Sequence, residues 1–179
     1  MPSIALSSSR SKPHEAPFVG PPWYVAAAWL FGAVVAQATV VHELAIRGVV
    51  PSLVLAVVVW YAIRVDARRA AVYGLVAGLC EDVLSPGTGA AWMIATGVSA
   101  VAASLLSRGF FADSIPLVTG ITFVTTLLRA LLFWVAMALA GYPAGLGTIH
   151  LHEALFEGVL NAAVVVLAMI VARRYAPQR

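Results

Sequence analysis

The sequence predicts an all-α membrane protein in which six transmembrane helices form one bundle. Three observations lead to this fold class. Of the 179 residues, 61% are hydrophobic and 11% are charged, whereas a soluble domain has about 45 to 50% apolar and about 25% charged residues. The mean hydropathy is +0.93. Long apolar runs follow one another with short polar breaks, and Lys and Arg gather in alternate breaks.

The chain divides into one membrane domain and two short tails. Residues 1–22 contain five prolines and a run of three serines but little apolar material, so we predict a disordered cytoplasmic tail. Residues 23–174 form the transmembrane domain, and residues 175–179 form a second cytoplasmic tail. There is no room for a separate soluble domain.

A cleaved signal peptide is an alternative interpretation of the first apolar run. Ala36 and Ala38 fit the small-residue pattern of a cleavage site. However, the apolar run continues through Val41, and the charges Arg10 and Lys12 lie well before the run begins. We therefore interpret this run as the first membrane helix.

Six apolar runs are candidate membrane spans, namely residues 24–42, 49–63, 69–85, 89–106, 115–140 and 154–172. The second and third runs are short. Residues 49–63 would cover only about 22 Å as a helix, so Arg47 and Arg64 would have to extend outward at its ends. The third run could instead be re-entrant, an alternative that its length does not exclude.

The distribution of positive charge favours six crossings with both termini in the cytoplasm. If all six runs cross, nine cations lie on one side and only Arg47 on the other, while Arg129 lies inside a run. If the third run does not cross, the count becomes five against five. Short cytoplasmic loops collect Lys and Arg. The nine cations are Arg10, Lys12, Arg64, Arg68, Arg69, Arg108, Arg173, Arg174 and Arg179.

Several polar side chains fall inside the predicted spans at a similar depth. At 1.5 Å per residue, Asp82 and Arg129 both lie about 20 Å from the cytoplasmic end. Glu157 and Asn161 reach the same layer. Because a guanidinium at this depth rarely faces lipid, we expect Arg129 to pair with Asp82, Glu81 or Glu157, with extension toward the interface as the alternative. Glu81, Asp82, Arg129, Glu157 and Asn161 would then form an intramembrane polar network.

Two stripes of small residues mark faces where helices can approach closely. Gly74 and Gly78 lie one turn apart in the third run, and Ala28, Gly32 and Ala36 lie along the first. Packing within the chain is the simpler interpretation of either stripe. A surface for a partner helix is the alternative.

The sequence contains no recognisable catalytic or metal-binding motif. Cys80 is the only cysteine, which excludes a disulfide within the chain and a thiolate metal cluster. His150, His152 and Glu153 lack the helical histidine pair typical of zinc sites. Because no nucleophile has an evident base beside it, we predict a protein without enzymatic activity, cofactor, metal or nucleic-acid partner.

Four segments of the chain follow a pattern found in a known family: VPSL at 50–53, the pair Arg68-Arg69, GLVAGLCEDVLSPGTGAAW at 74–92 and HEALFEGVLNAAVVVLAMIVARR at 152–174. They resemble the family of the bacterial rod shape-determining membrane protein MreD. The resemblance covers roughly residues 24–174, with Asn161 at the matching polar position of the last helix. Like that family, the chain has a proline-led second helix and a glycine-rich third helix that ends in an acid before a P-x-G turn.

The resemblance implies a non-catalytic, multi-pass subunit of the cell-wall elongation machinery in the bacterial cytoplasmic (inner) membrane. Such a subunit binds MreC, a single-span protein, and works indirectly with the MreB filament, RodA and a class B penicillin-binding protein. A partner helix would pack along a small-residue stripe. Arg64, Arg68 and Arg69 would face the filament or anionic membrane lipid, and each contributes about 1 kcal/mol near such a surface.

An alternative function belongs to another class. The MreD family is similar in fold to the substrate-binding S-components of energy-coupling-factor micronutrient transporters. In that case the five polar residues named above would line a ligand site. The small-residue stripe of the first run would then contact the transporter scaffold.

Overall fold

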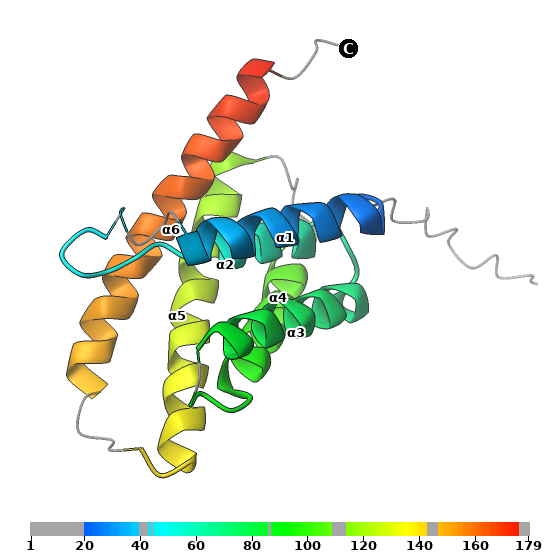
Figure 1. The fold of residues 1–179 in the computed structure, drawn as a ribbon. Helices are drawn as coiled ribbons and strands as arrows, with labels where there is room; N and C mark the ends of the chain where they lie inside the picture. Colours follow the sequence, from blue (N-terminus) through cyan, green and yellow to red (C-terminus); the bar gives the residue numbers. More distant parts are fainter. Residues whose placement is uncertain are drawn as a thin grey trace, which may run out of the picture.

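The computed structural model is all-helical over the residues that it describes, which are 20–39, 43, 45–85, 87–108, 114–142 and 147–175. In this part of the chain there is no strand, so the predicted all-α class is confirmed (Figure 1). The predicted tails at 1–22 and 175–179 lie almost entirely outside the described residues. The helices are α1 (Trp23–Thr39), α2 (Leu53–Ala62), α3 (Ala67–Leu84), α4 (Ala91–Leu106), α5 (Ile115–Leu139) and α6 (Gly147–Tyr175).

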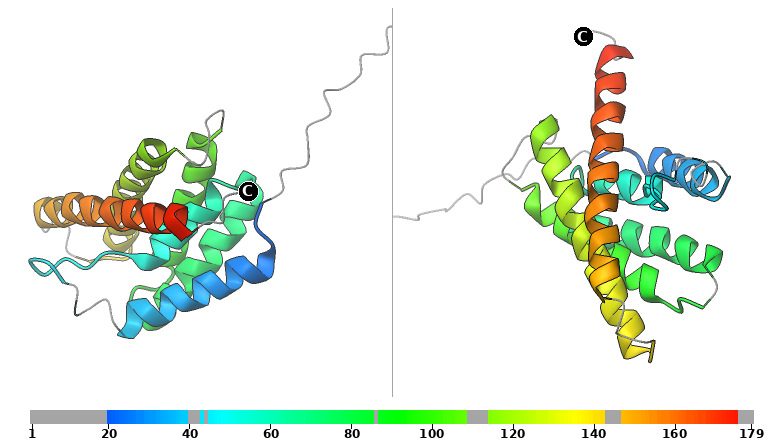
Figure 2. Two further views of the ribbon diagram at one scale, coloured as in Figure 1. Left: turned by 90° about the horizontal axis from the view of Figure 1, so that it is seen from above. Right: turned by 90° about the vertical axis from the view of Figure 1, so that its left-hand side faces the viewer.

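Two of these helices are long and apolar enough to cross a membrane, namely Ile115–Leu139 and His150–Arg174. Helices α1, α2 and α4 are apolar but shorter. In Figure 1 the axis of α1 runs crosswise to those of α5 and α6, and the right-hand view of Figure 2 shows α1 to one side of α6. Helix α1 packs on α2 and α3. The structure therefore combines two helices of membrane length with four shorter helices beside them.

Helix α2 forms the centre of the fold and contacts α1, α3, α4, α5 and α6. Its residues Val54, Leu55, Val58 and Val59 are almost completely buried. Large apolar side chains are exposed on each of the other five described helices, and none is exposed on α2. Such extensive apolar surface is unusual for a soluble monomer and is expected where outer helix faces contact hydrocarbon.

The helix α2 begins later than the apolar run that predicts it. Arg47 and Gly48 both have positive φ, 54° and 81°, and form a tight turn between Ile46 and Val49. The residue before a proline favours an extended backbone, and the helix starts only after Pro51. As a ten-residue helix, α2 extends about 15 Å. The predicted span 49–63 is thus an extended segment followed by a short helix.

Candidate functional site

The non-helical residues before α2 have backbone polar groups paired with amide side chains from other helices. Gln37 on α1 accepts a hydrogen bond from the Leu53 N–H at 2.8 Å and donates one to the Pro51 carbonyl at 3.2 Å. Asn161 on α6 accepts a hydrogen bond from the Ser52 N–H at 2.7 Å. Unpaired backbone groups are costly in an apolar interior. Gln37 and Asn161 therefore allow an extended segment to be buried.

Arg129 on α5 points into the interior, and only 4% of its surface is exposed. Its Nη2 donates a hydrogen bond to Glu81 Oε1 on α3 at 2.8 Å, and its Nη1 donates one to Ser52 Oγ at 2.8 Å. The guanidinium carbon lies 4.4 Å from the centroid of the Trp92 ring, a distance at which the ring face attracts a cation. Of the three acids expected as partners, Glu81 is the one in contact.

Glu81 is buried in the same interior, with 9% of its surface exposed. Its Oε1 pairs with Arg129, and its Oε2 accepts a hydrogen bond from Thr96 Oγ1 on α4 at 3.1 Å. A buried carboxylate is tolerated when it is paired with a cation and hydrogen-bonded. This single side chain therefore links α3 to both α4 and α5.

Asn161 completes the arrangement from α6, where its side chain is fully buried. Its Nδ2 donates hydrogen bonds to Thr126 Oγ1 at 3.2 Å and to Glu157 Oε1 at 3.4 Å. Polar side chains from α3, α4, α5 and α6 thus meet the start of α2. We call this set the polar centre, and it consists of Ser52, Glu81, Thr96, Thr126, Arg129, Glu157 and Asn161.

Asp82 was expected in this network, and the structure corrects that expectation. Its Oδ1 accepts hydrogen bonds from Thr88 Oγ1 at 2.8 Å and from the Trp92 N–H at 3.2 Å, and its Oδ2 accepts one from the Met93 N–H at 2.9 Å. These amides lie in the first turn of α4, where a negative charge is favourable. Ala90, at the N-cap position, provides no side-chain hydrogen bond. Asp82 therefore caps α4 from the end of α3.

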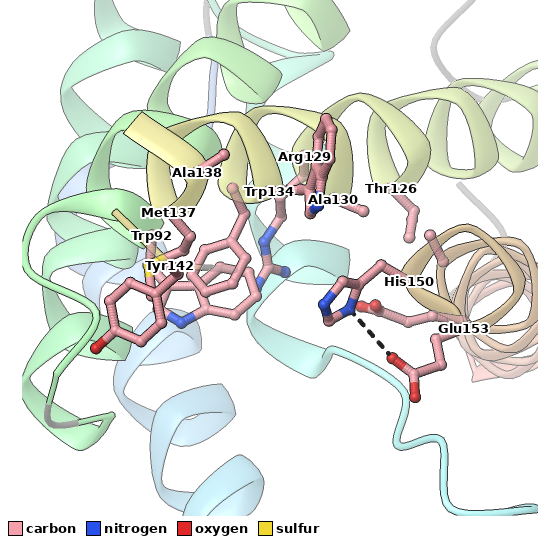
Figure 3. Close-up of a pocket in the computed structure, with 13 residues that line it drawn as sticks. Trp92, Thr126, Arg129, Ala130, Trp134, Met137, Ala138, Tyr142, His150 and Glu153 are labelled. Carbon is pink, nitrogen blue, oxygen red and sulfur yellow. Dashed lines mark ion pairs between the residues drawn. The ribbon is translucent and has the colours of Figure 1, made fainter. Parts of the chain in front are cut away.

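A cavity of about 410 Å³ opens beside the polar centre, between the start of α4, the second half of α5 and the first half of α6 (Figure 3). Trp92 and Trp134 contribute aromatic rings to its lining, and α6 contributes Glu153 and Glu157. Arg129 also lines this cavity. The polar centre is therefore in contact with a space large enough to hold a small molecule.

The two small-residue stripes differ in their surroundings. A Cβ atom added at Gly74 would lie 2.6 Å from the Ala100 Cβ, and one added at Gly78 would overlap the backbone of Trp92 and Met93. The α3 stripe thus packs directly on α4. A Cβ added at Gly32 would have no neighbour within 4 Å. The α1 stripe is open: Ala28 and Gly32 are exposed and Ala36 is half-buried.

The predicted basic cluster lies around the turn between α2 and α3. Arg68 and Arg69 are exposed, and the Asp66 carboxylate, which caps α3, lies 3.4 Å from Arg69 Nε. Arg64 is half-buried and packs over the Trp60 ring, with 5.2 Å between its guanidinium carbon and the ring centroid. The exposed positive charge of this cluster therefore comes mainly from Arg68 and Arg69.

Sequence reasoning overlooked the roles of Gln37, Ser52 and Thr96. Small polar residues are common in membrane helices, so Thr96 carries no distinguishing signal. Ser52 does carry a sequence signal, because a serine between a proline and an apolar run is typical of a helix N-cap. Its Oγ accepts a hydrogen bond from the Leu55 N–H at 3.1 Å.

The chemistry available to the polar centre is that of holding charge in a dry interior. Within the described residues, no group of three His, Cys, Asp or Glu side chains could hold a metal ion. Cys80 is half-buried on α3.

Neither a protein-family model, nor a curated protein, nor a solved structure matches this chain.

Proposed function

We propose that this chain is a non-catalytic membrane subunit of a bacterial cell-wall elongation complex and has the role of MreD in that complex. The observation that carries the proposal is the sequence between Gly74 and Trp92, which resembles the third helix and following turn of that family. In the structure, Gly74 and Gly78 support close packing of α3 on α4, and Glu81 lies in the polar centre. The same segment thus fixes the interior of the bundle.

The proposal includes six membrane passes in the inner membrane, with both termini in the cytoplasm. Helices α5 and α6 have the required length. Helix α2 extends only about 15 Å, about half of the roughly 30 Å of hydrocarbon, so the non-helical residues before it would have to complete the pass. The hydrogen bonds from Gln37 and Asn161 make burial of these extended residues favourable.

This topology can be tested by cysteine labelling in intact cells, in a Cys80→Ala background. Arg47→Cys and Tyr142→Cys should react with a membrane-impermeant maleimide added from outside. Arg68→Cys and Arg108→Cys should react only after the membrane is permeabilised. Labelling of Arg68→Cys from outside, with the other sites unchanged, would contradict the proposed topology.

In this function the polar centre is structural, and the partner surface lies elsewhere. We assign the site for an MreC-like transmembrane helix to the stripe of Ala28, Gly32 and Ala36 on α1, because small residues let two helix backbones approach closely. Arg68 and Arg69 would face anionic lipid or the MreB filament. Through MreC the subunit would act on RodA and a class B penicillin-binding protein.

The deciding experiment is affinity purification of the tagged chain from native membranes in mild detergent, followed by mass spectrometry. Recovery of an MreC-like single-span protein with a penicillin-binding protein supports the proposal. The variant Arg68→Ala/Arg69→Ala should retain the single-span protein but recover less filament protein. Absence of shape-complex proteins from a well-folded preparation would reject the function.

The cavity favours a second candidate function, that of a substrate-binding S-component of an energy-coupling-factor transporter. A space of about 410 Å³ beside Arg129 and Glu157 has the size of a small-molecule site. In this case the same purification would recover a membrane scaffold protein with two ATPases. The two functions therefore differ in a single measured result, the identity of the co-purified proteins.

A further inference from the structure

We propose that the cavity between α4, α5 and α6 is a binding site for a small organic ammonium ion. The cavity measures about 410 Å³, within the range of about 300 to 1,000 Å³ that holds small molecules. Only the residues around the cavity support this inference. It therefore applies whether the chain acts in the shape complex or in a transporter.

Glu157 is an acid on the cavity lining that has no cation as a direct partner among the described residues. Glu81 neutralises Arg129 through the ion pair at 2.8 Å. Glu157 accepts a hydrogen bond from Asn161 at 3.4 Å, but within the described part of the chain it has no ion-pair partner. Glu153 has His150 at 3.5 Å, and both side chains are about half exposed. A ligand with a positive charge near Glu157 would supply this carboxyl group with an ion-pair partner.

Aromatic rings on the cavity wall favour an organic cation over an inorganic one. Trp134 of α5 and Tyr142, which follows α5, both contribute rings to the lining (Figure 3). The face of an aromatic ring attracts an ammonium group, and it also packs against the carbon atoms of a ligand. Trp92 already has the Arg129 guanidinium over its ring. Trp134 and Tyr142 are therefore the rings that we assign to the ligand.

The test uses the purified full chain in phosphatidylglycerol nanodiscs and three probes that share a phenol but differ in the charge of the side arm. These are tyramine, which is cationic, 2-(4-hydroxyphenyl)ethanol, which is neutral, and 4-hydroxyphenylacetate, which is anionic. Isothermal titration calorimetry should show tyramine binding at least about tenfold more tightly than the neutral compound, because one buried charge pair is worth that factor or more. Tightest binding of the anion, or binding of none of the three at millimolar concentration, would overturn the proposal.

Variants show whether the binding occurs in this cavity. Glu157→Gln should reduce the affinity for tyramine to that for the neutral compound, while the exposed Glu43→Gln should change nothing. Trp134→Leu should weaken the binding of all three compounds. It provides a second variant in case Glu157→Gln does not fold. Retention of full tyramine affinity in both cavity variants would reject the site. Recovery of an MreC-like partner by Glu157→Gln should be unaffected, so a failure here is separate from a failure of the proposed function.

A final comparison identifies the source of the ammonium group. In nanodiscs that contain phosphatidylethanolamine, reduced tyramine affinity would assign the site to the lipid headgroup. Unchanged affinity would assign it to a soluble amine. Both results are compatible with an ammonium site, and the charge series above decides whether that site exists.

Discussion

The inner face of α3 and the outer face of α1 are both rich in small residues, but they have opposite surroundings. On α3, Gly74 and Gly78 lie against α4, and the same face continues to Glu81 in the polar centre. On α1, Gly32 has no neighbouring atom within 4 Å of the position a Cβ would take. The α3 face is therefore packed against another helix of the same chain, whereas the α1 face is open at Gly32 and has room for a second helix.

This difference shows what a small-residue stripe does and does not indicate. Small side chains permit close backbone approach, and they do so equally for a helix of the same chain and for a partner helix. The surroundings of the stripe distinguish the two cases. Substitutions on the α3 side should therefore affect the stability of the fold, and substitutions on the α1 side should affect association.

The largest effect is expected where the α3 face meets α5. Arg129→Met leaves Glu81 buried without its counter-charge, and breaking a buried pair in this way costs about 3 to 5 kcal/mol. We expect strongly reduced accumulation and a lower unfolding free energy, measured by SDS titration of the purified protein. Adding Glu81→Met should restore much of the loss, because an apolar pair of similar volume can replace an ion pair.

The neighbouring acid provides the matched control for this rescue. Asp82→Met combined with Arg129→Met should give no recovery, since Asp82 forms its hydrogen bonds with Thr88 and with the start of α4. Equal rescue by Glu81→Met and by Asp82→Met would mean that Arg129 does not pair specifically with Glu81.

The second largest effect is expected on the α3 stripe. Gly78→Val would place side-chain atoms on the backbone of Trp92 and Met93, and because backbone cannot move aside easily, we expect a loss of about 3 kcal/mol. The fraction of protein that remains monodisperse after heating measures this loss. Gly32→Val should behave as the native chain in the same assay. Similar destabilisation by both substitutions would remove the distinction between the two faces.

The sequence alone was sufficient to predict the helical class and an ion pair between Arg129 and an acid of another helix. Long apolar runs without charge favour helices, and a guanidinium within such a run is expected to pair with an acid, as Arg129 does with Glu81. Which of the two adjacent acids faces inward is a different question. Neighbouring helical residues point about 100° apart, so the answer depends on the rotation of α3, which its packing on α4 determines.

The apolar pattern also did not predict the non-helical segment before α2. Val49 and Val50 continue the apolar run into the helix that follows, and the backbone at Pro51 and Ser52 is paired with the side chains of Gln37 and Asn161 from other helices. Such long-range pairing leaves no local signal. Pro51 and Ser52 provide a partial one, since together they are typical of a helix start.

A smaller effect is expected at Asp82, at the end of the α3 face. Asp82→Ala removes a carboxylate that accepts three hydrogen bonds around the first turn of α4. Loss of a helix cap costs about 1 kcal/mol. SDS unfolding should therefore show a modest loss, well below that of Arg129→Met. A loss as large as that of Arg129→Met would mean that Asp82 contributes to the polar centre itself.

The smallest effect on stability, and the most informative for function, is expected at Gly32. Gly32→Val adds an isopropyl group to an open helix face, so the unfolding free energy should change by no more than about 0.5 kcal/mol. A partner helix packed on that face would be displaced, and recovery of the MreC-like protein should fall several-fold in quantitative pull-downs. Gly120→Val is the matched control, because Gly120 on α5 is equally open but lies outside the α1 stripe. If Gly120→Val reduced recovery and Gly32→Val did not, the partner surface would belong to α5, and the openness of the α1 stripe would reflect contact with lipid.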